Sequence, residues 1–512
     1  MKKIFTLLAG VVFWVNGFSQ PTIQWQKCFG GTDGEDVSAI VQTYDGGYIA
    51  AGSTNSNNGD ASGNHGLADY WLVKIDNAGV IQWQKCYGGT GNDYANSVIQ
   101  SSDSGYVIAG ISDSNDGDVS GNHGIDDVWI VKVDNNGTLQ WQKCLGGTNR
   151  EWTHSIIESV NGGYVLVGRT YSNNGDVNGN HGFTDMWVVK LSGIGTIQWQ
   201  KCLGGTAGEE GQEIIQTSDG GYAAIGTAGA DNGDVSGNHG LEDYWFVKLD
   251  SSGTIQWQRC FGGTDHDDAT SVIQTSSGGY CAAGYTSSND GDVSGNNGGY
   301  DFWVVNFDDT GNILFQKTFG GTADDFCNTV MEDAGNTYIV TGMAYSNNGD
   351  VSGNHGLTDV WVVKMNGIGI LQWQKCFGGT FFDASNSFIA TSDGGYAIGG
   401  SAVSNNGDVS GNHGNFDYWV VKLGPDNVGI HQMSLAESNF FLSPNPATNE
   451  IRVESSEFRV ESVEVYDVLG QPQTSNLKPQ TNAVDVSSLA PGIYFVKVKS
   501  KEGERAAKFV KQ

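Results

Sequence analysis

The chain has 512 residues, of which 76 are glycine, and its 57 acidic against 26 basic residues give a formal net charge of −31. Such an acidic protein repels phosphate backbones, which excludes nucleic acid as a partner, and 11% aromatic residues supply enough core material to exclude disorder for most of the chain. The length exceeds one ordinary core and predicts several domains or a repeat array.

Residues 1–19 have the features of a secretory signal peptide. Lys2 and Lys3 precede an apolar run over 4–15, and small residues follow, so we expect cleavage near Ser19. A buried N-terminal helix is the alternative. No later stretch approaches the roughly 20 apolar residues of a membrane helix, so we expect no transmembrane segment.

Residues 20–425 consist of repeats of constant length. Three aromatic series each recur every 58 residues. The first series is Trp25, Trp83, Trp141, Trp199, Trp257, Phe315 and Trp373. The second is Trp71, Trp129, Trp187, Trp245, Trp303, Trp361 and Trp419, and the third is Tyr48, Tyr106, Tyr164, Tyr222, Tyr280, Tyr338 and Tyr396. Because every series has seven copies, we interpret these rings as wedges between packed repeats rather than as ligand platforms.

Each repeat predicts four short strands, typified by 70–76, 81–88, 95–100 and 106–111. These segments are rich in Val, Ile, Trp and Tyr and are separated by glycine-containing turns. One antiparallel sheet per repeat predicts an all-β fold, a seven-bladed β-propeller, with an open β-solenoid as the alternative.

The two ends of the array predict closure of the ring. The array starts at Thr22 in the second strand of a unit, and it ends with 416–423 in a first strand. We expect the three N-terminal strands and the C-terminal strand to pair in one blade, which removes open sheet edges.

Six of the eight cysteines occupy one repeated position: Cys28, Cys86, Cys144, Cys202, Cys260 and Cys376. Equivalent positions lie too far apart to bridge, so we interpret them as small buried apolar residues. Cys281 and Cys327 fall outside this position, and the sequence leaves open whether they pair across neighbouring repeats.

A twelve-residue pattern recurs between the expected fourth strand of one unit and the first strand of the next. In 116–127, oxygen-bearing side chains stand at positions 1, 3, 5 and 12, and glycine stands at position 6. This spacing resembles the EF-hand calcium loop, although the flanks predict strands. The resemblance implies these calcium ligands: Asn58, Asp60, Ser62 and Asp69; Asp116, Asp118, Ser120 and Asp127; Asn174, Asp176, Asn178 and Asp185; Asn232, Asp234, Ser236 and Asp243; Asp290, Asp292, Ser294 and Asp301; Asn348, Asp350, Ser352 and Asp359; Asn406, Asp408, Ser410 and Asp417.

The composition of these loops predicts weak binding at most. Five copies begin with Asn and all close with Asp rather than Glu, which is typical of extracellular sites with dissociation constants of roughly 10⁻⁴ to 10⁻³ M. The alternative is that the same residues build Asx turns and bind no metal. A histidine occurs in six loops, and Asn297 replaces it in the fifth, which favours a hydrogen-bonding role.

A further acidic position follows each Gly-Gly-Thr sequence, at Glu35, Asp93, Glu151, Glu209, Asp267, Asp325 and Asp383. We expect these loops on the same face as the twelve-residue loops, which predicts one strongly acidic face. Glycoside hydrolysis requires one asymmetric acid pair, and the visible breaks in the repeat, Asn297, Phe315, Thr318 and 152–154, assemble no recognisable catalytic group.

The repeat ends near Pro425 and the composition changes. The leader contributes a charge of +2 and residues 432–512 contribute −1, which leaves −32 for residues 21–431. The tail contains Pro-Asn-Pro at 444–446, Tyr-Asp-x-x-Gly at 466–470, Gly-x-Tyr at 492–494 and a basic end at 508–511. We assign 426–439 to a linker and 440–512 to a small Ig-like β-sandwich.

This succession of motifs resembles the C-terminal sorting domain of the bacterial type IX secretion system. The resemblance implies contact with the type IX machinery and a protein that is secreted or attached to the outer-membrane surface. An ordinary Ig-like binding module is the alternative. We expect a non-enzymatic propeller that binds a glycan or another surface macromolecule. The alternatives are a carbohydrate-active, endoglucanase-like hydrolase and a structural or adhesion component.

Overall fold

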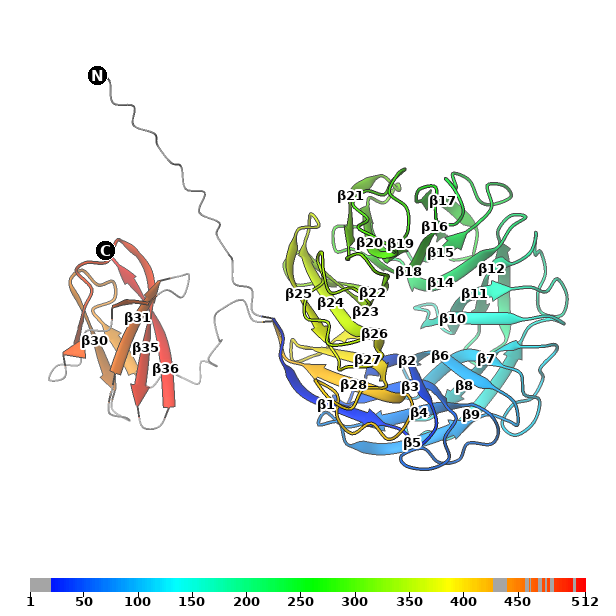
Figure 1. The fold of residues 1–512 in the computed structure, drawn as a ribbon, viewed down its shortest axis with the longest axis horizontal. Helices are drawn as coiled ribbons and strands as arrows, with labels where there is room; N and C mark the ends of the chain where they lie inside the picture. Colours follow the sequence, from blue (N-terminus) through cyan, green and yellow to red (C-terminus); the bar gives the residue numbers. More distant parts are fainter. Residues whose placement is uncertain are drawn as a thin grey trace, which may run out of the picture. The chain divides into compact units, whose positions relative to one another are not determined.

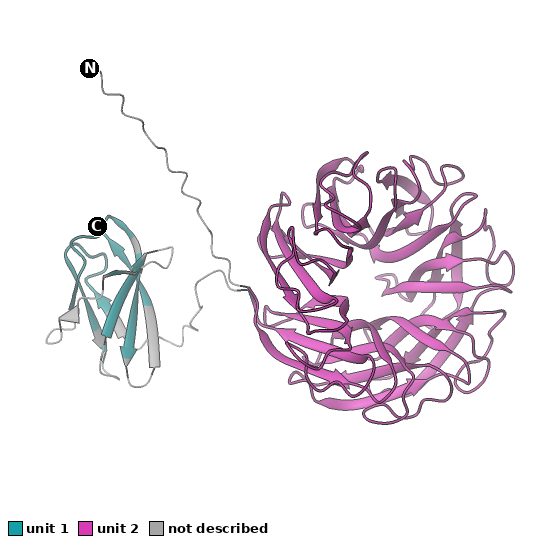
Figure 2. Ribbon diagram, in the orientation of Figure 1, with its two compact units in different colours: residues 1–19, 426–512 teal, residues 20–425 magenta. Residues whose placement is uncertain are grey.

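The computed structural model describes residues 20–426, 440–455, 460, 462–467, 472–474, 477–478, 483–500 and 503–512. Residues 20–425 form one compact unit, and residues 426–512 belong to a second (Figure 2). Every regular element in the described residues is a β-strand. The expected signal peptide and almost all of the expected linker lie outside the described residues.

The larger unit contains seven four-stranded antiparallel sheets, arranged as the blades of a propeller (Figure 1). From the innermost strand outward, blade 1 contains β2 (Glu35–Gln42), β3 (Tyr48–Thr54), β4 (Asp69–Ile75) and β5 (Ile81–Tyr87). Blade 2 contains β6 (Asp93–Gln100), β7 (Tyr106–Ser112), β8 (Asp127–Val133) and β9 (Leu139–Leu145). Blade 3 contains β10 (Glu151–Glu158), β11 (Tyr164–Thr170), β12 (Asp185–Leu191) and β13 (Ile197–Leu203). Blade 4 contains β14 (Glu209–Gln216), β15 (Tyr222–Ala228), β16 (Asp243–Leu249) and β17 (Ile255–Phe261). Blade 5 contains β18 (Asp267–Gln274), β19 (Tyr280–Thr286), β20 (Asp301–Phe307) and β21 (Ile313–Phe319). Blade 6 contains β22 (Asp325–Asp333), β23 (Thr337–Ala344), β24 (Asp359–Asn366) and β25 (Leu371–Phe377). Blade 7 contains β26 (Asp383–Ala390), β27 (Tyr396–Ala402), β28 (Asp417–Leu423) and β1 (Ile23–Phe29).

Blade 7 closes the ring by joining the two ends of the array. The N-terminal strand β1 pairs antiparallel with β28, and Cys28 lies opposite Trp419. Blade 7 also contacts blade 1, because the Tyr418 hydroxyl donates to the carbonyl of Trp71 at 2.9 Å. These contacts confirm the seven-bladed fold and the predicted closure of the ring between its two ends, but the strands that make up the closing blade differ from those expected.

The expected grouping of strands into blades is wrong by two strands. The sequence predicts that 70–76 and 81–88 share a sheet with 95–100 and 106–111, whereas β4 and β5 pair with the preceding β2 and β3. Blade 7 therefore takes three strands from the C-terminal end and only β1 from the N-terminal end. A repeat has no visible origin in the sequence, and its phase is fixed by non-local hydrogen bonds such as those between β3 and β4, where Thr54 lies opposite Asp69.

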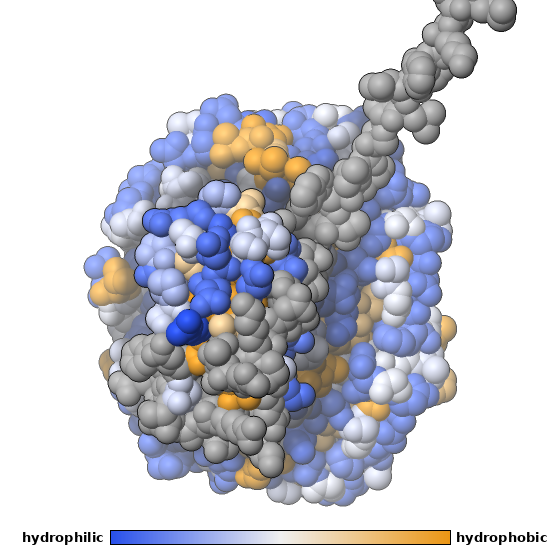
Figure 3. All heavy atoms as spheres, turned by 90° about the vertical axis from the view of Figure 1, so that its left-hand side faces the viewer, coloured by the Kyte–Doolittle hydropathy of each residue, from blue (hydrophilic) through white to orange (hydrophobic). Residues whose placement is uncertain are grey.

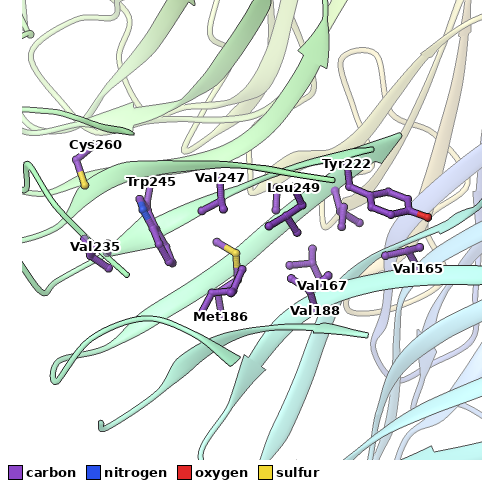
Figure 4. Close-up of a cluster of buried hydrophobic side chains, with 14 of the residues drawn as sticks. Val165, Val167, Met186, Val188, Tyr222, Val235, Trp245, Val247, Leu249 and Cys260 are labelled. Carbon is purple, nitrogen blue, oxygen red and sulfur yellow. The ribbon is translucent and has the colours of Figure 1, made fainter. Parts of the chain in front are cut away.

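The cores lie between neighbouring blades. In Figure 4, Met186 and Val188 of blade 3 face Trp245 and Val247 of blade 4, and all four side chains are fully buried. Every tryptophan of the series that begins at Trp71 is likewise fully buried. This packing confirms that the repeated rings are wedges between blades. Burial of these rings removes a large apolar area from water at each junction.

All eight cysteines are buried and free. The six repeated ones therefore are the small core residues that their spacing predicts. Cys281 and Cys327 also carry free thiols and pack in one core cluster between blades 5 and 6.

The C-terminal unit contains two four-stranded sheets that share one core. The first consists of β29 (Phe440–Ser443), β30 (Glu450–Ser455), β34 (Ala483–Asp485) and β33 (Leu477–Lys478). The second consists of β32 (Pro472–Thr474), β31 (Ser462–Asp467), β35 (Gly492–Ser500) and β36 (Gly503–Lys511). Val484 of the first sheet and Val496 and Phe509 of the second are fully buried in this core. Two sheets around one core agree with the expected small sandwich.

Candidate functional site

The twelve-residue loops connect the second and third strands within each blade, not one blade to the next. In blade 1, Asn58 Oδ1 accepts a hydrogen bond from the amide of Thr32 at 2.9 Å, and Asn58 Nδ2 donates to the Thr32 hydroxyl at 2.9 Å. Asp60 Oδ2 accepts from the amide of Gly30 at 3.4 Å. Gly30 and Thr32 belong to the connection that enters the blade, so these loop residues fasten that connection in place.

The other two predicted ligand positions face different partners. Ser62 Oγ accepts from Gln84 Nε2 at 2.5 Å. Asp69 accepts from the amide of His65 at 3.0 Å and from His65 Nδ1 at 2.6 Å, and its side chain is fully buried. The six loops that contain histidine share this contact between histidine and aspartate.

The four predicted ligand positions of the blade 1 loop thus bond to four different parts of the structure. No group of three or more His, Cys, Asp or Glu side chains is arranged to hold a metal ion in the described residues. Calcium binding would have to use the Asn and Ser oxygens as well and displace these hydrogen bonds. Calcium binding by these loops therefore stays a prediction.

The second acidic position lies inside the molecule, not on an acidic face. Glu35 is fully buried, accepts from the amide of Gly31 at 2.8 Å and accepts from the Thr54 hydroxyl at 2.8 Å. Burial raises the pKa of the equivalent Asp93 to about 6. Because the first residue of each innermost strand is buried in this way, all seven acids position the strand entry rather than a ligand.

The repeat breaks at the next residue of the same strands. We call these seven second residues of the innermost strands the inner ring: Asp36, Tyr94, Trp152, Glu210, Asp268, Phe326 and Ala384. Their register partners on the second strands also differ between blades, and these are Ser53, Ile111, Arg169, Thr227, Tyr285, Met343 and Ser401. Chemical variety is therefore concentrated at one end of the innermost strands.

Blades 3 and 4 contribute a charged part of the inner ring. Glu210 accepts from His154 Nε2 at 2.6 Å and from Arg169 Nη1 at 2.6 Å. The Arg169 guanidinium lies over the Trp152 ring, 4.0 Å from its centroid. Burial alone would raise the pKa of Glu210, but the His154 imidazole and the Arg169 guanidinium hold it below its usual range. The sequence identifies Trp152 and His154 as breaks but gives no sign of their partners.

Blades 5, 6 and 7 contribute a continuous series of aromatic contacts, which we call the aromatic arc. Its members are Tyr285, Tyr300, Phe326, Tyr345, Phe382 and Phe416. Tyr345 and Phe416 are 42% and 38% exposed. The described residues on the side seen in Figure 3 are mostly hydrophilic, with separate apolar patches among them.

Asp36 and Asp268 of the inner ring form no ion pair with a Lys, Arg or His side chain among residues 20–426. Burial and the nearby carboxylate of Glu242 together raise the pKa of Asp268 to about 7. Asp36 accepts a hydrogen bond from the Ser401 hydroxyl. The remaining breaks in the repeat have structural partners instead, since Phe315 packs against Tyr338 and the Thr318 hydroxyl donates to the Ser294 carbonyl.

A cavity of about 420 Å³ opens beside Asp36. Its lining comes mainly from blades 7 and 1 and includes Asn55, Tyr94, Phe382 and Phe416. Two carboxyl groups, aromatic walls and two side-chain amides give this cavity the mixed lining of a small-ligand site.

The tail motifs fix the C-terminal unit through its backbone. Asn445 Oδ1 accepts from the amide of Val510 at 2.9 Å, and its Nδ2 donates to the carbonyl of Lys508 at 3.3 Å. The Tyr494 hydroxyl donates to the carbonyl of Ala490 at 3.0 Å. The Pro-Asn-Pro and Gly-x-Tyr motifs therefore hold the last strand and the turn before β35.

Residues 442–512 match the family described as the secretion system C-terminal sorting domain. The C-terminal unit is a type IX secretion sorting domain. The sorting domain implies interaction with the secretion machinery, and the protein is exported and then secreted or attached at the cell surface. No helix in the described residues has the length and apolar character needed to span a membrane.

No curated protein matches this chain. Among solved structures, the extracellular domain of BT4673 from B. thetaiotaomicron is 11% identical with a TM-score of 0.41, over 96% of this chain and 60% of that one. Sqt1 from Chaetomium thermophilum is 11% identical with a TM-score of 0.39, over 80% and 100%. BBS1N, solved in complex with ARL6DN, is 9% identical with a TM-score of 0.42, over 81% and 99%. The present chain thus spans about 60% of the length of BT4673's extracellular domain, and at these TM-scores the propeller assignment rests on the sheet topology.

Proposed function

We propose that this exported propeller is a non-enzymatic binding protein that holds a glycan at the cell surface or in the medium, through the face that carries the inner ring. The observation that carries the proposal is the position of the breaks in the repeat. Seven nearly identical blades differ mainly at one end of their innermost strands, where aromatic and charged side chains meet. Packing alone requires no such variety.

The composition of this face suits sugars. The aromatic arc offers ring faces and edges for stacking on sugar rings, and the charged groups of blades 3 and 4 offer hydrogen-bond partners for hydroxyls. The loops add an exposed apolar fringe at Leu67, Ile125, Phe183, Leu241 and Leu357. A surface of this kind marks a binding site on an exported protein.

Titration calorimetry against a panel of soluble polysaccharides tests the proposal with the mature chain. Tyr345→Ala and Phe416→Ala should each weaken binding about five- to tenfold, because an aromatic contact contributes about 1 kcal/mol. Tyr44→Ala is the matched control, because Tyr44 is 70% exposed in the turn at the opposite end of β2. Equal losses in all three variants would reject this face as the binding site, and no binding to any polysaccharide would reject glycan binding and favour the structural or adhesion role.

A second candidate function, glycoside hydrolysis, depends on Glu210 and Asp268. They occupy the same position on the neighbouring strands β14 and β18, and their pKa values are shifted in opposite directions. At neutral pH one carboxyl is ionised while much of the other is protonated, which is the division of roles that acid-catalysed glycoside cleavage needs. Release of reducing ends that disappears in both Glu210→Gln and Asp268→Asn would establish this activity, and its absence in the wild type would exclude it for the substrates tested.

A further inference from the structure

The cavity beside Asp36 contains a carboxyl group that has no ion-pair partner among residues 20–426. Asp36 is exposed at the cavity, and one of its oxygens accepts from the Ser401 hydroxyl. Among residues 20–426, no Lys, Arg or His forms an ion pair with Asp36. The other acid in the lining, Glu35, is fully buried and already accepts hydrogen bonds from the amide of Gly31 and the Thr54 hydroxyl. Asp36 is therefore the acid available to a ligand.

Aromatic and apolar side chains surround this carboxylate. Phe382 and Phe416 contact each other edge to face, with ring centroids 5.7 Å apart, and both line the cavity together with Tyr94 and Met343. A ring face attracts a cation, and the attraction is larger where water is partly excluded. Rings around a free carboxylate favour an ammonium group that is attached to a larger body.

The side-chain amides of the cavity add neutral acceptors. Asn386 Nδ2 donates to the carbonyl of Val37 at 2.8 Å, and Asn55 Nδ2 donates to the carbonyl of Leu67 at 3.3 Å. Both side chains line the cavity, and their Oδ1 atoms accept no hydrogen bond from residues 20–426. These oxygens are suited to accept from an ammonium or a hydroxyl group.

The charge of the whole propeller points to the same class of ligand. Residues 21–431 carry a formal charge of −32, so the protein attracts a polycation and repels a glycan rich in carboxylate or sulfate groups. Among surface glycans, one built from amino sugars combines repeated ammonium groups with sugar rings that can stack on aromatic side chains.

We propose that the cavity binds the ammonium group of an amino-sugar glycan, with Asp36 as its counter-ion and with Tyr94, Phe382 and Phe416 against the sugar ring. This inference rests on the proposed glycan-binding function and assigns the charge class of the glycan. The N-acetylated form of the same glycan lacks the positive charge and should bind less tightly.

Calorimetry with two oligosaccharides of equal length, a glucosamine hexamer and an N-acetylglucosamine hexamer, tests the inference. The mature chain is titrated at pH 6 in 150 mM salt, where most amines are protonated and distant charges are screened. The glucosamine hexamer should bind at least about tenfold more tightly, and Asp36→Asn should remove most of this preference. The matched control is Asp309→Asn, which removes one charge from an exposed turn residue.

The outcomes separate this inference from the proposed function. Equal affinity for both hexamers would overturn the charge assignment while leaving glycan binding intact. Binding to neither hexamer would also overturn the charge assignment. Equal weakening by Asp36→Asn and Asp309→Asn would show a non-specific attraction and would also overturn it. If Asp36→Asn lowers the unfolding temperature, Tyr94→Ala takes its place and should weaken glucosamine binding without changing the response to salt.

Discussion

Asp301 in blade 5 is a buried carboxyl whose ionisation the fold compensates poorly. Its side chain is fully buried, it accepts from the amide of Asn297 at 2.7 Å, and its Oδ1 has no hydrogen-bond partner. Burial and the neighbouring carboxylate of Asp325 raise its pKa from 3.8 to about 7. The other six blades supply a histidine at the position of Asn297. Replacement of Asp301 by Asn should therefore stabilise the protein at alkaline pH.

The sign and size follow from proton linkage. A carboxyl whose pKa is raised by folding binds its proton more tightly in the folded state, so its contribution to stability falls as pH rises between 3.8 and about 7. Between pH 5.5 and pH 8.5 this shift costs about 2 kcal/mol of unfolding free energy, since one pKa unit corresponds to about 1.4 kcal/mol. The Asp301→Asn variant should lack this loss. Its advantage over the wild type should therefore grow by about 2 kcal/mol across that pH range.

Urea unfolding followed by tryptophan fluorescence measures this difference in the propeller alone, because every tryptophan after Trp14 lies within 25–419. The range starts at pH 5.5 because the isoelectric point is about 4.4 and solubility falls near it. The matched control is Asp359→Asn in blade 6, where the carboxyl contacts His355 Nδ1 at 2.5 Å. That variant should be destabilised at neutral pH. If Asp301→Asn and the wild type lose stability in parallel from pH 5.5 to 8.5, the assigned cost of ionising Asp301 is wrong.

Three further predictions use the same repeat. Lys190 is 5% exposed, donates to the Gly162 carbonyl and has its pKa lowered to about 8 by burial, whereas the equivalent Lys74 pairs with Asp45. Asn161→Asp should supply the missing carboxylate partner of Lys190 and stabilise the fold by about 1 to 3 kcal/mol at pH 7. That gain should shrink above pH 8 as the wild-type lysine loses its proton, and a pH-independent gain would contradict the reasoning. If the loops bind calcium, 5 mM calcium should raise the unfolding temperature by the equivalent of about 1 kcal/mol per site while magnesium does not, and identical curves with EDTA would leave them as turns. Deletion of residues 20–29 removes β1 and leaves an open edge on β28, so size-exclusion chromatography should show oligomers, and a clean monomer would indicate that the ring does not need β1.

Much of the candidate site was not predicted from the sequence, and the reasons differ between its parts. Both partners of Glu210, His154 and Arg169, lie on blade 3 while Glu210 lies on blade 4, and nothing in a linear sequence relates those positions. The buried lysines that meet turn aspartates, such as Lys74 and Asp45 at 2.9 Å, were missed for the same reason. One signal was available, since the second residue after each Gly-Gly-Thr-x-x sequence varies in charge and size directly after an acidic position that repeats in all seven units.

The sequence by itself determined the all-β class, the seven repeats, the pairing of the two ends and the sorting domain. These features follow from local spacing: a constant period of 58 residues sets the number of blades, and alternating apolar residues set the strands. Only the tertiary structure decided which strands share a blade, that the Glu35 series is buried, and that Asp36, Tyr94 and Phe416 line one cavity. The physical reason is that these properties depend on hydrogen bonds and contacts between residues far apart in the chain, and a periodic sequence is compatible with several such arrangements until its ends are joined.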